Sequence, residues 1–150
     1  MTRLLTLALI GALFVFITPQ LVLADAKEPE KVEVRVHIIH ASNEGTKVDA
    51  SLEDLRRQLD AFSFSSFRLL GMESLTLAFG EQGSISLPGE RELTVLPRDR
   101  DAKRRLRLRL TIGDIIDTSY TIAEGASLII GGPRHEGGHL ILAVTHIAAP

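Results

Sequence analysis

Apolar and polar side chains alternate in short segments along most of this 150-residue chain. A period of two residues is typical of a β-strand with one buried face. From about Phe64 onward such segments recur every 8–13 residues, separated by turns that contain glycine or proline. This spacing indicates an antiparallel sandwich or open barrel. The expected strands in this part lie at about residues 64–70, 75–79, 85–87, 93–95, 106–112, 116–122, 128–130 and 140–147.

Two segments precede these strands. Residues 32–38 alternate Val or Ile with Glu, Arg and His, which predicts a further half-buried strand. The next segment has helical spacing, with four apolar side chains on one face: Leu52, Leu55, Leu59 and Phe62. Ser51 is placed to cap this helix, and Asp54 follows three residues later. The predicted fold class is α+β, mostly β, with one amphipathic helix packed on an antiparallel sandwich-like sheet.

The N-terminal residues have the composition of a secretory signal peptide. Arg3 is followed by an almost wholly apolar run, Leu4–Ile17, and then by Val22-Leu23-Ala24, which has short side chains at the two positions that a signal peptidase reads. The apolar run has about 14 residues, fewer than the roughly 20 that a helix needs to span a bilayer, so a retained membrane anchor is the less favoured alternative. We divide the chain into a signal peptide (1–24), a flexible leader (25–31) and a single β-rich domain (32–150). The expected location is periplasmic or secreted.

Composition excludes several classes of function. The chain has no cysteine, which excludes thiol catalysis, thiolate zinc sites, disulfide scaffolds and attachment to lipid through cysteine. Removing residues 1–24 takes one basic residue from a formal net charge of −2 and leaves −3. A nearly balanced charge and few aromatic side chains argue against nucleic acid as a partner.

The chain contains one literal zinc-peptidase motif, His135-Glu136-Gly137-Gly138-His139. That chemistry needs a helix, because one helical turn brings both imidazoles to the same face, where they bind zinc beside a Glu that acts as general base. Two adjacent glycines each disfavour a helix by about 1 kcal/mol relative to alanine. We therefore expect a hairpin loop here and no catalytic site. A metal-dependent hydrolase that uses His135, Glu136 and His139 is the alternative.

The other histidine spacings also disfavour a shared metal ion. His139 and His146 are seven residues apart on one expected strand, so they point to opposite faces. His37 and His40 are three residues apart and do the same. We expect neither a metal site nor a bound cofactor.

The densest charged segment is Lys103–Arg109. On a strand, Arg105, Arg107 and Arg109 line one face and leucines line the other. One interpretation is a site for a partner that bears phosphate, such as an anionic glycolipid. The favoured interpretation is a solvated strand face whose arginines pair with acids such as Glu90, Glu92, Asp114 or Asp117.

A glycine-rich segment separates the last two expected strands. It predicts a long loop, Gly131–Gly138, with Arg134, His135 and Glu136 at its tip. Binding residues tend to collect on loops that a rigid sheet holds, and hairpin loops are usually shorter than this one. We therefore expect a partner to contact these three residues, against the alternative of a tolerated surface insertion.

The segment Thr118–Gly132 resembles part of the outer-membrane channel domain of bacterial secretins. The shared pattern is a strand, an acidic-glycine turn at Glu124-Gly125, and an apolar strand that ends in two glycines. The resemblance covers 15 residues, and the chain is too short for a secretin channel. More broadly, the chain resembles small secreted β-rich envelope proteins of Gram-negative bacteria. These resemblances imply an envelope location and a role in an assembly, and they carry no catalytic residue.

The functional hypothesis is a non-catalytic exported protein that binds another envelope or secretion-machinery protein, for example as an accessory of an export or surface assembly. A secretory signal and a well-patterned scaffold without an assembled active site support it. The metal-dependent hydrolase and the binder of anionic glycolipid are the alternatives.

We predict cleavage after Ala24, because no later site presents such small side chains to the signal peptidase. The intact mass of the exported protein should correspond to a chain that begins at Asp25. Ala24→Arg should block cleavage and leave the precursor in the membrane fraction. A wild-type chain that still begins at Met1 would contradict the prediction.

Overall fold

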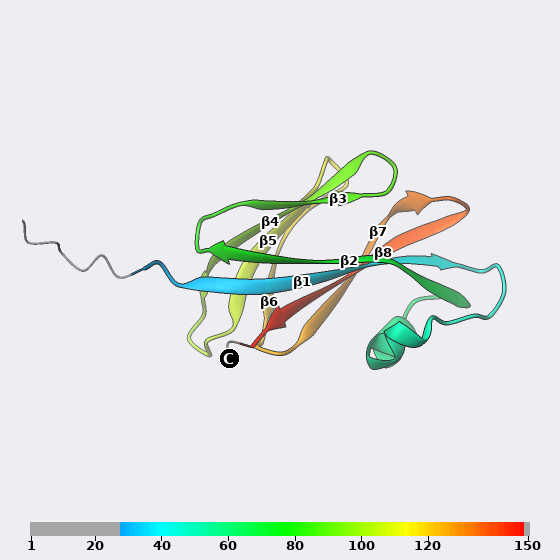
Figure 1. Cartoon of the computed structure of the whole chain (residues 1–150), viewed down its shortest axis with the longest axis horizontal. Helices are drawn as coiled ribbons and strands as arrows, with labels where there is room; N and C mark the ends of the chain where they lie inside the picture. Colours follow the sequence, from blue (N-terminus) through cyan, green and yellow to red (C-terminus); the bar gives the residue numbers. More distant parts are fainter. Residues whose placement is uncertain (1–27, 149–150) are drawn as a thin grey trace, which may run out of the picture.

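The computed structural model describes residues 28–148, which form two four-stranded antiparallel sheets packed face to face (Figure 1). The first sheet has the order β2-β1-β8-β7, with β1 (Lys31–Ser42), β2 (Ser66–Ala78), β7 (Ser127–His135) and β8 (Gly138–Ile147). The second has the order β3-β4-β5-β6, with β3 (Gly83–Leu87), β4 (Arg91–Arg100), β5 (Leu106–Ile112) and β6 (Ile116–Ile122). The predicted fold class is confirmed.

The core between the sheets comes from the period-two pattern. Val34 and Val36 of β1 are fully buried, as are Leu106, Leu108 and Leu110 of β5. The residues between them, such as Arg107, are exposed on the outer face of the second sheet. Burial of one such aliphatic side chain is worth about 1.5–3 kcal/mol, so this face fixes the register of each strand.

A second, smaller core lies on the outer face of the first sheet. A 3₁₀ helix, η1 (Ala50–Leu55), runs into a single turn of α-helix, α1 (Arg56–Leu59). Their leucines pack on strands β1, β2 and β8, and the cluster consists of Ile39, Ala41, Leu52, Leu55, Leu59, Phe67, Ile141 and Ala143. Phe62 lies beyond the helix but still packs against this cluster.

The predicted N-cap was wrong by two residues. The carboxylate of Asp49 accepts hydrogen bonds from the Ser51 backbone N–H (3.1 Å) and from the Ser51 hydroxyl (2.7 Å). Ser51 is therefore already inside the helix, and its hydroxyl is a donor to the cap. Both residue types can cap a helix, so composition alone does not separate them.

The prediction of two strands around Gly71 was also wrong, because β2 runs through this glycine. The register between β1 and β2 shifts between Ile38 and Ile39, and Leu70 is the extra residue on β2. A β-bulge bends a strand without ending it, so the pattern is interrupted while the pairing continues. Seven strands follow the helix in the described part of the chain, not eight.

The expected signal peptide, its cleavage site and most of the leader lie outside the described residues. Within residues 28–148, no helix is long and apolar enough to cross a membrane.

His146 is buried in the sandwich with only 2% of its surface exposed. Its Nδ1 atom has no hydrogen-bond partner among the described residues. Burial lowers the pKa of His146, and Arg100 lowers it further, while Glu124 and a hydrogen bond with the Ile122 backbone act in the opposite direction. Folding therefore favours the neutral imidazole.

This burial predicts that acid destabilises the protein. The unfolded chain takes up a proton on His146 near the ordinary pKa of 6.5, whereas the folded chain does so only at lower pH, so the free energy of unfolding falls as pH drops below that value. Urea unfolding at pH 7.5 and 5.5 should show the loss, and His146→Leu should reduce it. An unchanged pH dependence in His146→Leu would contradict the assignment.

Candidate functional site

The hairpin between β7 and β8 differs from the long loop that we expected. Only Glu136 and Gly137 lie between the strands, with φ angles of 43° and 76°. Positive φ at both central residues is what a tight type I′ hairpin turn requires. The expectation of a loop at Gly131–Gly138 was wrong, because most of this segment belongs to the strands.

A β-bulge in β7 absorbs the extra residues. Gly131 pairs with Ile141 and Arg134 pairs with His139, so Gly132 and Pro133 together oppose one residue of β8. The bulge reverses the alternation of side chains along the end of β7. Arg134 therefore shares a face with His139, which is the outer face of the first sheet.

The zinc-peptidase motif consequently lacks its helix. His135 pairs with Gly138 and faces the second sheet, where a Cβ on Gly89 would lie 3.8 Å from its Nδ1 atom. His139 lies on the opposite face beside Phe64, with a ring separation of 5.4 Å. The prediction that this motif forms a hairpin and not a helix is confirmed, although the connection is a tight turn and not a long loop. The two imidazoles do not converge. Residues 28–148 contain no group of three or more His, Asp or Glu that could hold a metal ion.

The remaining histidines occupy opposite faces as predicted. His146 belongs to the inner face of β8, whereas His139 lies on the outer face. His37 pairs with Ala143 on the outer face, and His40 lies on the inner face, where its ring approaches His135.

Gly138 brings the hairpin into contact with the backbone of β1. A Cβ at this position would overlap the Ala41 carbonyl oxygen and lie 3.0 Å from His40 Nε2. The Nε2–H of His40 donates a hydrogen bond of 2.9 Å to the His135 carbonyl oxygen, and the two imidazoles meet edge to face at 5.9 Å. The turn is therefore fixed to the end of β1, one of the two central strands of the first sheet.

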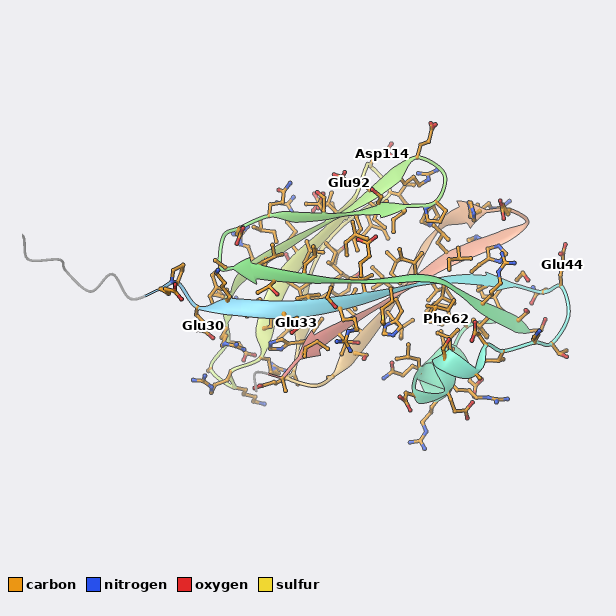
Figure 2. All side chains as sticks on the ribbon, viewed as in Figure 1. Glu30, Glu33, Glu44, Phe62, Glu92 and Asp114 are labelled. Atoms are coloured by element: carbon orange, nitrogen blue, oxygen red, sulfur yellow. The ribbon has the colours of Figure 1, made fainter. Side chains whose placement is uncertain are left out.

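An open pocket of about 560 Å³ lies at this end of the sandwich. Its polar lining comes from the hairpin and from the loop after β1, where Glu44 projects at the same end of the molecule (Figure 2). The lining residues are Asn43, Glu44, Phe64, Arg134, His135, Glu136, Gly137, Gly138 and His139. Glu136 is 70% exposed and His135 only 18% exposed, so of the predicted contact residues Arg134 and Glu136 are accessible, and His135 is mainly a support.

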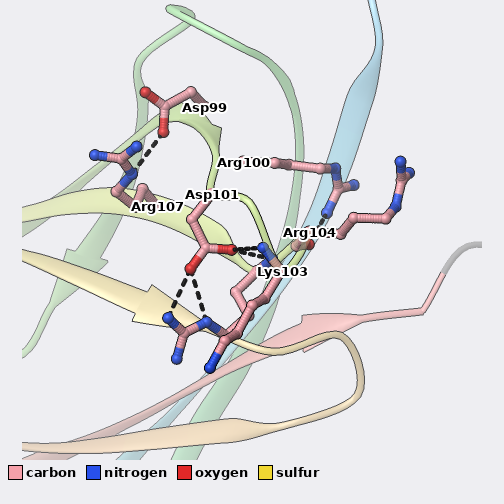
Figure 3. Close-up of polar contacts among 7 residues, drawn as sticks. Asp99, Arg100, Asp101, Lys103, Arg104 and Arg107 are labelled. Atoms are coloured by element: carbon pink, nitrogen blue, oxygen red, sulfur yellow. Dashed lines mark hydrogen bonds and ion pairs between the residues drawn. The ribbon is translucent and has the colours of Figure 1, made fainter.

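Arg105, Arg107 and Arg109 of the basic segment all pair with carboxylates. Arg105 binds Asp101 at 2.7 Å, Arg107 binds Asp99 at 2.8 Å (Figure 3), and Arg109 forms two contacts of 2.6 Å with Asp117. Hydrogen bonds from Arg109 hold the pKa of Asp117 below its usual value, and those from Arg105 do the same for Asp101. The arginines pair with acids as expected. Of the four acids that we named, however, only Asp117 is one of the partners.

No protein-family model, curated protein or solved structure matches this chain. The resemblance of Thr118–Gly132 to secretins stays a prediction. In the structure this segment passes from β6 in the second sheet to β7 in the first.

We predict that Gly138→Ala destabilises the fold by about 1–3 kcal/mol or more, because the new methyl group would overlap backbone that cannot move freely. Gly131→Ala is the matched control in the same hairpin, since the nearest atom to its Cβ would be Phe62 Cε1 at an ordinary 3.7 Å. Its effect should stay near 0.5 kcal/mol. Equal urea midpoints for the two variants would refute the close contact with β1.

Proposed function

We propose that this chain is an exported, non-catalytic domain that binds another envelope protein through its hairpin surface. We define this surface as Asn43, Glu44, Arg134, Glu136 and His139. The observation that carries the proposal is the open pocket that these residues line on a turn packed tightly against β1.

The composition of the hairpin surface suits a protein partner. Arg134 and Glu136 offer opposite charges, Asn43 can donate and accept hydrogen bonds, and Phe64 adds an aromatic ring to the wall. Protein interfaces combine such groups, and arginine and aromatic residues are enriched in them. A site for a small apolar ligand encloses most of the ligand, whereas this pocket is open.

Rigidity also supports binding. Gly138 and the His40–His135 hydrogen bond hold the turn against β1, so the exposed side chains project from a backbone that needs little ordering when a partner binds. The N-terminal sequence supports export. The opposite placement of His135 and His139 supports a binding role over the metal-dependent hydrolase.

Site-specific photo-crosslinking in cells tests the proposal. A photoreactive amino acid at Glu44, Arg134 or Glu136 should give one adduct of the same mass at all three positions. Control positions at the exposed Thr76 and Thr121 should not give it. Identical adducts at the control positions, or none at the hairpin, would contradict the proposed surface.

Charge reversal provides the second arm. Arg134→Glu combined with Glu136→Lys should abolish the adduct formed from position 44, because it inverts the charge pattern that the partner meets. The matched control is Arg35→Glu combined with Glu33→Lys, an exchange at the 3.7 Å ion pair on β1. Loss of the adduct in both double variants would indicate a general effect instead of a contact.

A further inference from the structure

A second pocket, of about 250 Å³ and with a mainly polar lining, lies on the outer face of the second sheet. Strands β4, β5 and β6 all contribute to it, and its lining is Arg98, Asp99, Arg107, Arg109 and Ser119. Three arginines and one serine thus line one small space. Only one carboxylate, that of Asp99, lines the pocket itself.

A β-bulge places Arg98 in this pocket. Pro97 pairs with Leu108 and Asp99 pairs with Arg107, so Arg98 is the extra residue on β4. Regular alternation would send Arg98 and Asp99 to opposite faces, whereas the bulge brings both to the outer face. Pro97 has no N–H to contribute to the ladder at this point, which favours an irregularity there.

The arginine pairs leave donors free. Arg107 uses Nε toward Asp99, and Arg109 uses Nε and one terminal nitrogen toward Asp117. A guanidinium carries five N–H donors, so both groups retain donors after these contacts. Within residues 28–148, Arg98 makes neither an ion pair nor a side-chain hydrogen bond. The carboxylates therefore orient Arg107 and Arg109 beside an unpaired Arg98.

The surrounding charge favours an anion. Residues 98–107 contain six basic and two acidic side chains, in a chain whose formal net charge is −2. Such a local excess attracts anions and concentrates them at the surface. Lys103 and Arg104, both exposed, extend the basic region along the β4–β5 connection (Figure 3).

We propose that this pocket binds a phosphate group. Planar guanidinium groups match phosphate oxygens with paired, charge-assisted hydrogen bonds, and the Ser119 hydroxyl can add another. Of the arginines that the sequence suggested for a glycolipid, Arg105 takes no part, because it does not line the pocket and is bound to Asp101. This site is independent of the hairpin surface. Its phosphate can belong to a lipid headgroup or to a soluble compound.

Inorganic phosphate is the first probe. Titration of the isotope-labelled mature protein at constant ionic strength, with chloride as the control anion, should shift the amide resonances of residues around 98, 107, 109 and 119. Arg98→Gln should weaken the apparent affinity about tenfold, as expected for loss of one charge-assisted hydrogen bond. Arg91→Gln, an exposed arginine at the other end of β4, should bind phosphate as the wild type does.

Vesicles distinguish the two sources. Binding to phosphatidylglycerol vesicles but not phosphatidylcholine vesicles, with loss in Arg98→Gln, would assign the phosphate to a lipid surface. Phosphate binding without vesicle binding would assign it to a soluble compound. The proposal is overturned if chloride shifts the same resonances equally, if the shifts lie elsewhere, or if Arg98→Gln binds phosphate as tightly as wild type while its other resonances show an intact fold.

Discussion

The rest of the structure packs on, or pairs with, the antiparallel strands β1 and β8. These strands form the centre of the first sheet, and the helix covers their outer face where Ile39, Ala41, Ile141 and Ala143 lie. Leu140 and Leu142 point into the sandwich, whereas Ile141 and Ala143 point toward the helix. Burial on both faces explains why β8 reads as a continuous apolar run instead of an alternating one. The inner core, the helix and the hairpin all attach to this pair.

Single-residue bulges then decide which side chains meet. The bulge at Gly132 and Pro133 turns His135 inward and leaves Arg134 with His139 on the outer face. The bulge at Arg98 brings that arginine and Asp99 to the face of Arg107. In both cases an extra residue reverses the alternation of faces. Both candidate surfaces are therefore consequences of irregular pairing on an otherwise regular scaffold.

This dependence explains what could be predicted from the sequence. Burial produces the period-two pattern, so the mostly β fold and the helix on its sheet were predictable, and the glycines of the HExxH motif correctly indicated a hairpin. A bulge changes pairing without changing residue types in a recognisable way. The strand through Gly71, the two-residue turn at Glu136 and the place of Arg98 were therefore missed. The partners of Arg105 and Arg107 were missed for a related reason, because Asp99 depends on the bulge and Asp101 lies in the connection after β4.

The two surfaces differ in chemistry and in position. The hairpin surface presents both charges, whereas the pocket lined by Arg98, Arg107 and Arg109 presents an excess of positive charge. The β7–β8 hairpin and the β4–β5 connection lie at opposite ends of the long axis (Figure 1). Substitutions at sites that are far apart and share no partners act additively. A single sandwich can therefore hold a protein at one end and a phosphate-bearing partner near the other without either contact disturbing the second. Such an arrangement suits a domain that links two components, because the β1–β8 pair and the core between the sheets fix the distance between them.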